Sequence, residues 1–309
     1  MKEPMDVLRD FPVRKSRKQK QKFRDAVIPY LESMGYFVKT EKGSFGSRNI
    51  LIGRPESAEY LITAHYDTCA ELPFPNFITP CSFWGFLGYQ LFLIMLMFAL
   101  AAAVSGLGAF LLPDTPAAFW GFELTLLLFI YLVMFGPANP HCTNDNTSGV
   151  ISVLSIARAL PDDQKDKVAF ILFDLEEEGL IGSASYAQRH KKEIQNQINL
   201  NLDCVGDGDY MMFFPTKKMR KDPEKMALLE HCKGSYGPKV IRIRKKGFSV
   251  YPSDQVNFPY GVGICALRKK YNTLYLGRIH TRRDTILEQT NVNLLQAAII
   301  SMISCGAAK

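Results

Sequence analysis

Histidine and carboxylate side chains occur together in several short motifs of this 309-residue chain. His65 and Asp67 stand two residues apart in A-H-Y-D-T, at the end of an apolar run. Residues two apart on a strand point to the same face, so one can bind a metal while the other accepts the second imidazole proton and orients it. Taken alone, the pair is also typical of a structural histidine, and the interpretation depends on the motifs that follow.

Three consecutive glutamates form the sharpest signal, in D-L-E-E-E-G at residues 174–179, directly after the apolar run V-A-F-I-L-F. Their mutual repulsion and desolvation are unfavourable near a core unless a cation compensates them. Asp203 closes the next apolar run in N-L-D-C, and His280 stands in R-I-H-T-R-R-D-T. Asp145 in N-D-N precedes a predicted helix, where an acid is also a common cap.

A mixture of imidazole and carboxylate ligands suits zinc. The charges are balanced when two Zn²⁺ ions (+4) meet Asp145, Glu177 and Asp203 (−3) and one bridging hydroxide (−1). A carboxylate that stays beside such a pair without a metal of its own can serve as general base.

The elements that must position these groups alternate between strand and helix. Hydrophobic periodicity predicts an amphipathic helix within residues 16–35. It then predicts strands at 49–53, 60–65, 168–175 and 198–203, all typical of central strands, and helices at 148–160 and 181–190. This pattern indicates an α/β fold with a mixed, mainly parallel sheet between helices, whose sites form at the carboxyl ends of the strands.

An apolar insert interrupts this pattern, because residues 55–157 contain no Lys or Arg. Residues 83–112 carry no charge, residues 117–136 carry only Glu123, and about 20 apolar residues suffice to cross a bilayer. We therefore expect a transmembrane hairpin at 77–136 inserted into a single domain formed by 1–76 and 137–309. Two buried helices of a large soluble core are the alternative.

Positive charge is concentrated at the N-terminus. The net charge is +7, and residues 1–24 hold nine basic and three acidic residues, which gives +6. Beside a membrane hairpin, this basic helix is expected to contact anionic lipid, and no nucleic-acid partner is expected. Seven scattered cysteines and the lack of an apolar leader favour an integral membrane protein with a cytoplasmic catalytic domain. The oligomeric state is not indicated.

Together, H-x-D, N-D-N-x-S-G, E-E-x-G-L-x-G-S, the strand-end Asp and I-H-T-x-x-D-T resemble the motifs of the two-zinc aminopeptidase family, in the same order. The resemblance implies the zinc-exopeptidase fold and two zinc ions per chain. It also implies the ligand set His65 and Asp203 for one zinc, His280 and Glu177 for the other, and Asp145 as the bridge. Glu176 would be the general base and Asp67 the partner of His65.

The segment Y-P-S-D-Q-V-N-F resembles the family's S-D-x-x-x-F, which implies that Ser253, Asp254 and Phe258 shape the substrate pocket. Arg282 follows His280 closely and is expected to attract a substrate carboxylate, with a solvated basic rim as the alternative. The function expected is a membrane-anchored exopeptidase, most simply an aminopeptidase acting on short apolar or membrane-associated peptides. A single-zinc glutaminyl cyclase and a non-catalytic membrane scaffold are the alternatives.

Overall fold

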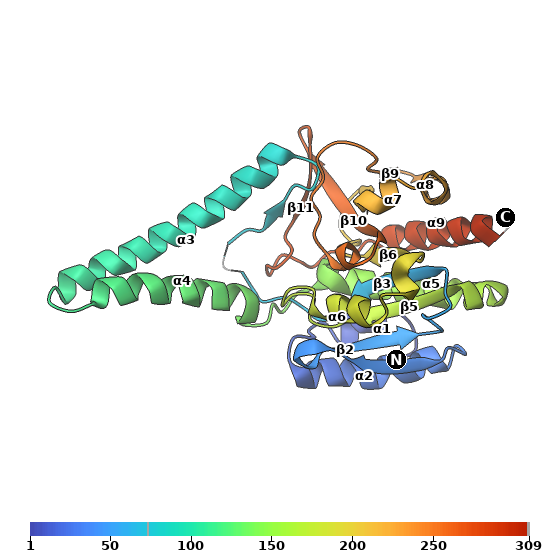
Figure 1. Ribbon diagram of the computed structural model, residues 1–309, viewed down its shortest axis with the longest axis horizontal. Coiled ribbons are helices and arrows are strands. Elements are labelled where there is room, and N and C mark those ends of the chain that lie inside the picture. The colour runs from blue at the N-terminus through green and yellow to red at the C-terminus, as the bar shows by residue number, and fades with distance from the viewer. Residues whose placement is uncertain (73, 308–309) are drawn as a thin grey trace.

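The computed structural model describes residues 1–72 and 74–307, and a twisted mixed sheet forms the centre of the molecule (Figure 1). The order along the sheet is β1 (Val38–Lys42), β2 (Arg48–Ile52), β5 (Val168–Phe173), β3 (Tyr60–His65), β6 (Ile198–Leu202), β10 (Tyr260–Lys270), β7 (Tyr210–Pro215), β9 (Lys239–Ile243) and β8 (Ser235–Tyr236). From the end of β10 the chain turns into β11 (Thr273–Gly277), which pairs with β10 and with the short β4 (Phe77–Ile78).

The four central strands β5, β3, β6 and β10 are parallel, and their carboxyl ends therefore lie at one edge of the sheet. Antiparallel pairs extend the sheet on both sides, through β2 next to β5 and β7 next to β10. The predicted mixed sheet between helices is confirmed, and its parallel pairs are those of this central group and the pair of β7 with β9. The strand predicted at 49–53 is β2, which is second from the edge rather than central. The apolar run indicated burial on both faces of the sheet, and burial does not fix the position of a strand in the sheet.

Helices cover both faces of the sheet, as the alternation of side chains on β5 requires. Phe170 and Leu172 pack into a core shared with α2 (Arg17–Glu32), α5 (Gly149–Ala159) and α9 (Gln289–Ala307). Ala169 and Ile171 face the other side, against Phe258 and α6 (Ile181–Arg189). Short helices complete the domain: α1 (Asp6–Asp10), α7 (Lys217–Arg220) and α8 (Pro223–Glu230).

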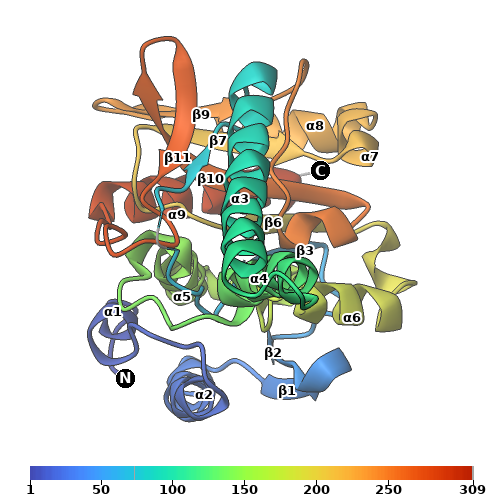
Figure 2. The same ribbon diagram turned by 90° about the vertical axis from the view of Figure 1, so that its left-hand side faces the viewer.

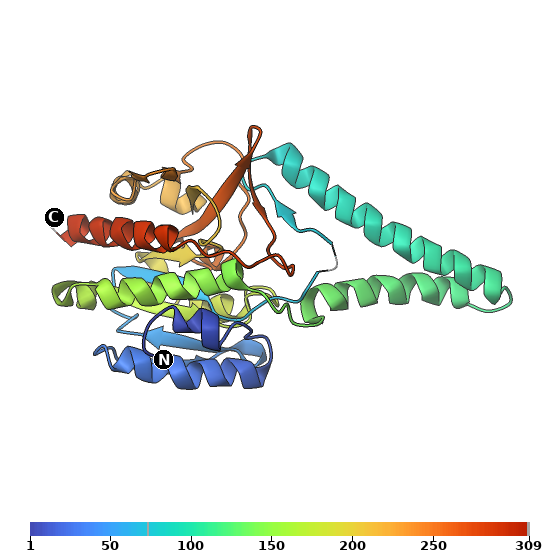
Figure 3. The ribbon, with the colours of Figure 1, turned by 180° about the vertical axis from the view of Figure 1, so that it is seen from behind.

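The apolar insert forms two long helices, α3 (Phe83–Leu111) and α4 (Ala117–Phe135), which project together away from the domain (Figures 1, 2 and 3). A helix of 29 residues is about 43 Å long, which exceeds the bilayer's hydrocarbon core of about 30 Å. Within the most apolar 18-residue window only 6% of α3 and 0% of α4 is buried. The structure therefore does not support the alternative of two buried core helices.

Candidate metal centre

Side chains from five segments meet beyond the carboxyl ends of the central strands. β3 ends at His65, β6 is followed directly by Asp203, and the loop after β5 carries Glu177. Neighbouring parallel strands end at one edge, so three motifs that lie far apart in the sequence converge there. Asp145 comes from the turn that precedes α5, and His280 comes from the loop that follows β11.

The two oxygens of Asp145 face different histidines. Oδ1 lies 3.4 Å from Nε2 of His65, which is itself 3.6 Å from Oδ1 of Asp203. Oδ2 lies 3.0 Å from Nε2 of His280, which is 3.5 Å from Oε2 of Glu177. Ligands of a tetrahedral zinc, at about 2.0–2.1 Å, are about 3.3–3.4 Å from one another. The donor atoms thus form two adjacent groups with zinc-like spacing, joined by Asp145.

Buried donor atoms without partners show that these groups fit a cation. Among the described residues, Nε2 of His65, Oε1 of Glu177 and Oδ1 of Asp203 are buried and make no hydrogen bond. A buried polar group left unpaired costs about 1–3 kcal/mol, and more when it is charged. A zinc ion held by these residues would satisfy all three, and the nitrogen and oxygen donors are those that zinc accepts.

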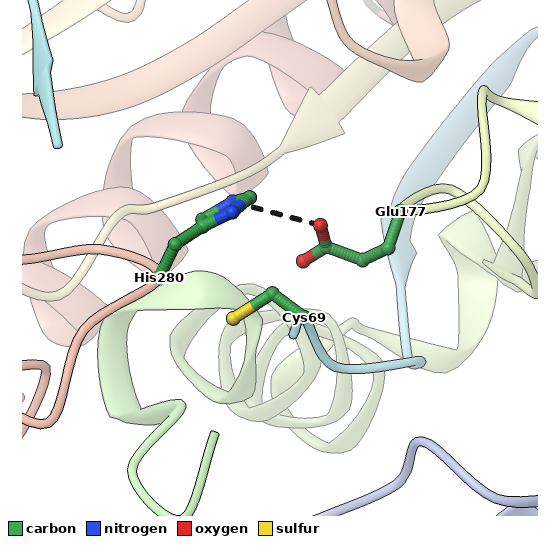
Figure 4. A group of neighbouring side chains, drawn as sticks. All are labelled: Cys69, Glu177 and His280. Atoms are coloured by element: carbon green, nitrogen blue, oxygen red, sulfur yellow. Dashed lines mark ion pairs between the residues drawn. The ribbon is translucent and has the colours of Figure 1, made fainter. Parts of the chain in front are cut away.

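Figure 4 shows the half of the centre that is formed by His280 and Glu177, with Cys69 beside them. The Cys69 sulfur lies within 4.8 Å of the donor atoms of both residues. It also lies 3.7 Å from the sulfur of Cys142, and this contact, together with burial, raises the pKa of the Cys69 thiol well above its usual value. Because the thiolate is the metal-binding form, the structure favours Cys69 as a neutral wall of the site.

Asp67 connects the histidine to the glutamate loop. Its two carboxylate oxygens accept the backbone N–H groups of Glu176 and Glu177, each at 3.2 Å. Nδ1 of His65 lies 3.2 Å from the Asp67 carbonyl oxygen and 3.6 Å from its carboxylate. A proton on Nδ1 would satisfy this contact and leave Nε2 free to bind metal, which is the geometry expected of a residue that orients His65.

Glu176 lies beside the donor atoms of His65 and Asp203. Its Oε2 is 3.9 Å from Nε2 of His65, and its side chain is 14% exposed. Burial raises the pKa of Glu176 well above its usual range, and the nearby carboxylates of Glu177 and Asp203 raise it further. A carboxyl group with a raised pKa at the edge of a metal site has the properties of a general base.

Asp284 supports the turn that carries Asp145. It is the acid of the motif I-H-T-x-x-D-T, but the sequence predicted no role for it. Its carboxylate accepts the backbone N–H of Asn144 at 2.7 Å and that of Asp145 at 2.9 Å. It is buried, and burial raises its pKa to about 8. Asn146 holds the same turn from the other side, since its side chain donates to the Leu202 carbonyl and accepts from Gly149. Asp145 is therefore held in position through its own backbone.

Arg14 is a second support that no sequence pattern indicated. Its guanidinium is fully buried and donates to the Tyr66 carbonyl at 2.5 Å and to the Thr147 hydroxyl at 3.1 Å. Its backbone N–H donates to the Thr68 hydroxyl. The N-terminal segment thus joins the H-x-D loop to the turn that carries Asp145.

The four residues predicted to bind substrate lie outside the cavity lining. Ser253 and Asp254 are fully buried, and Phe258 packs between Phe173 and Tyr186. Ser253 accepts a hydrogen bond from the side chain of Asn201 on β6, and burial raises the pKa of Asp254 to about 7. Arg282 is 74% exposed and pairs with Glu71 at 2.7 Å. The first three residues support the floor of the site, and Arg282 lies on its rim.

A cavity of about 330 Å³ opens over the metal centre. Its polar wall is formed by Asp145, Glu176, Glu177, Asp203 and His280. Its apolar wall is formed by six side chains: Ile78, Met134, Leu180, Tyr251, Leu276 and Ile279. Met134 belongs to α4 and Ile78 to β4, the strand that leads into α3. The base of the hairpin therefore forms part of the cavity.

Comparisons with known proteins agree with the motifs. The sequence profile of peptidase family M28 matches residues 133–303, more than half of the chain. Aminopeptidase YwaD of Bacillus subtilis is 44% identical over 66 residues, which span 20% of this chain and only 14% of that relative. The match confirms the family that the motifs suggested.

Solved structures share the fold at low sequence identity. Glutaminyl cyclase of Porphyromonas gingivalis superposes with a TM-score of 0.60 at 16% identity, covering 98% of this chain and 96% of that one. The LapA aminopeptidase of Legionella pneumophila gives 0.57 at 14% identity, covering 97% and 67%. A Zn-dependent exopeptidase of Parabacteroides distasonis gives 0.56 at 15% identity, covering 94% and 91%. This likeness concerns the architecture alone.

Proposed function

The chain belongs to peptidase family M28, and we propose that it is a membrane-anchored zinc aminopeptidase that removes apolar N-terminal residues from short or membrane-associated peptides. The observation that carries this proposal is the orientation of Asp145, whose two oxygens face His65 and His280 separately. A carboxylate held between two sets of donors supports a centre with two zinc ions per chain.

His65 and Asp203 would hold one zinc ion, His280 and Glu177 the other, and Asp145 both. When bound, zinc supplies a Lewis acid that polarises a carbonyl group and lowers the pKa of water. Glu176 then takes the proton of the water that attacks the scissile carbonyl and returns it to the leaving amine. A C–O bond forms, the C–N bond breaks, and the products are a free amino acid and a shortened peptide.

The cavity's lining supports an apolar N-terminal residue. Apolar side chains face a site of about 330 Å³, which is at the lower end of the range for small-molecule pockets. The acidic groups beside it attract the positively charged α-amine of a peptide. Because Met134 and Ile78 belong to the hairpin and its connecting strand, a peptide near the bilayer surface would reach the site directly.

The hairpin supports anchoring of the domain to a membrane, since both helices are long, apolar and exposed. Two crossings would return the chain to the side from which it left, so the proposed anchor would keep the whole domain on one side of the bilayer. We place this side in the cytoplasm, in keeping with the seven cysteines, none of which forms a disulfide in the structure.

A direct test is to purify the full-length protein in a mild detergent and assay it on a panel of aminoacyl reporter peptides. Hydrolysis of Leu, Phe and Met substrates is expected to exceed that of Asp and Lys substrates. Blocking the α-amine should abolish hydrolysis, and metal analysis should find two zinc ions per chain. Equal cleavage of free and N-blocked peptides would contradict an aminopeptidase.

The same preparation separates the alternatives. A glutaminyl cyclase would convert an N-terminal glutamine to pyroglutamate with one zinc per chain, and release of ammonia from a Gln-peptide would reveal it. Glu176→Gln serves as the inactive control for contaminating peptidases. Activity and zinc both absent from well-folded protein would instead favour the non-catalytic scaffold.

The contribution of the hairpin is tested by replacing residues 77–138 with a short flexible linker. This change removes Ile78 and Met134 from the cavity wall, so the preference for apolar residues should weaken. A soluble enzyme with unchanged preference would show that the hairpin contributes nothing to substrate choice.

A further inference from the structure

A second, larger cavity of about 1010 Å³ lies on the other side of the glutamate loop. It is bounded by α2, the turn at residues 43–46, the loop after β5 and the last residue of α4. Six cationic side chains line it, against the two carboxylates of Asp174 and Glu178: Lys15, Arg17, Lys20, Arg24, Lys42 and Arg48. We call it the basic cavity.

Most of this positive charge has no acidic partner. Among the described residues, only Lys20 of the six lies within 4.0 Å of a carboxylate, that of Asp174 at 2.7 Å. Arg24 donates to the Tyr66 hydroxyl and, like Arg48, to the neutral side chain of Gln21.

Lys15 donates to a backbone carbonyl, that of Met134. Arg17 and Lys42 make no side-chain hydrogen bond or ion pair within 1–72 and 74–307. Five cationic side chains that share one cavity and have no carboxylate within 4.0 Å repel one another, and an anion placed among them reduces that repulsion.

The position of the basic cavity relative to the hairpin identifies the source of the anion. Phe135, the last residue of α4, lines the cavity, and Lys15 binds the carbonyl of the residue before it at 2.9 Å. The cavity therefore lies where the second apolar helix ends, at the level of lipid headgroups if the hairpin spans a bilayer. Phe45 also lines it and is 86% exposed, so an apolar side chain beside the cavity is free to contact lipid.

We propose that the basic cavity binds the phosphate of an anionic phospholipid headgroup, beside the point where α4 leaves the bilayer. Arginine forks and lysine ammonium groups are the side chains that recognise phosphate, and basic pockets beside transmembrane helices select anionic headgroups. The proposal rests on the membrane anchoring proposed above, because a soluble protein would meet free phosphate instead.

The test uses full-length protein in a nonionic detergent, titrated with dioleoyl phosphatidylglycerol or dioleoyl phosphatidylcholine and followed by native mass spectrometry. Phosphatidylglycerol should bind at least about tenfold more tightly than the zwitterionic lipid. Arg17→Gln/Lys42→Gln should weaken phosphatidylglycerol binding about 25-fold, since each juxtamembrane cation contributes about fivefold. Both side chains are exposed, so the variant should fold.

A matched control removes the same charge elsewhere, with Lys191→Gln/Lys192→Gln beyond the C-terminal end of α6, and should change binding less than twofold. Equal loss in this control, or equal binding of both lipids, would overturn the proposal. Displacement of phosphatidylglycerol by an equal concentration of inorganic phosphate would also overturn it, because the site would then bind a soluble anion.

Carbonate extraction of membranes distinguishes failure of the lipid-site proposal from failure of the membrane anchoring on which it rests. Protein that stays in the membrane pellet without preferring phosphatidylglycerol refutes the lipid site alone. Protein that is released by carbonate refutes the anchoring, and the lipid site with it.

Discussion

The metal centre and the basic cavity are neighbours of opposite charge. The loop at residues 174–178 separates them: Glu176 and Glu177 line the cavity over the metal centre, and Asp174 and Glu178 line the basic cavity. In the metal centre Asp145 and Asp203 are buried, and the backbone N–H of Asp145 donates to Asp284, whereas Arg17, Lys42 and Arg48 of the basic cavity are exposed. This difference indicates a fixed, small cation on one side and a larger anion of variable position on the other.

The largest effect is expected from the bridge of the metal centre. Asp145→Asn should remove a negative charge from both donor groups, so zinc content should fall below one ion per chain. Activity should fall by more than about 10⁴-fold, beyond what a general base alone provides. Metal analysis and peptidase assays of the same sample measure both quantities.

Asp163→Asn changes an exposed acid that precedes β5, at the opposite end of this strand from the glutamate loop, and this matched control should keep zinc and activity. If the Asp145→Asn protein retained two zinc ions, the interpretation that Asp145 joins two groups of metal-binding atoms would be wrong.

The second expected effect distinguishes Glu176 from Glu178, two residues further along the shared loop. Glu176→Gln should lower kcat about 10²–10⁴-fold while zinc content stays unchanged, because a general base is lost and no ligand is removed. Glu178 lines the basic cavity, so Glu178→Gln should change kcat less than about threefold. Similar losses in the two variants would mean that the loop acts through its conformation rather than through Glu176 as the base.

Local motifs selected residues that the fold brings together, because each of them follows a strand or precedes a helix that its own sequence forms. His65, Glu177 and Asp203 come from three parallel neighbours, and parallel order alone brings them together. Asp284 and Arg14 were missed as supports since they act through contacts with distant backbone, across 139 and 52 residues. No window of sequence shows that such a contact will form.

The basic cavity illustrates the same limit. The N-terminal charge predicted contact with anionic lipid, but a basic helix alone is also typical of a solvated surface. Lys42 and Arg48 reach the cavity from β1 and β2, and Phe135 from the hairpin. The pattern gives the charge of each segment, and only the fold shows that the three segments surround one cavity.

A third prediction concerns the ion pair of Lys20 and Asp174, which lies between the metal centre and the basic cavity. Lys20 and Asp174 are 6% and 3% exposed, and they are 2.7 Å apart. Lys20→Met leaves a buried carboxylate without its cation, which should lower the free energy of unfolding by about 3–5 kcal/mol. Lys20→Met/Asp174→Asn should recover most of this loss, because no unpaired charge stays buried.

Thermal unfolding of the two variants in the same detergent measures the difference. A double variant no more stable than Lys20→Met would show that the pair stabilises the protein through packing rather than through the attraction of its charges.

The smallest effect is expected at Arg282, on the rim of the metal centre. Its ion pair with Glu71 is exposed, and exposed pairs contribute about 0.2–1 kcal/mol to stability. Because Arg282 lies outside the cavity lining, Arg282→Ala should change KM for dipeptides less than about threefold. A rise of tenfold or more, confined to substrates with a free carboxylate and absent for their amides, would instead show that Arg282 leaves Glu71 to bind the peptide's C-terminus. The metal centre would then combine its buried acidic site with a mobile cation, and the contrast with the basic cavity would weaken.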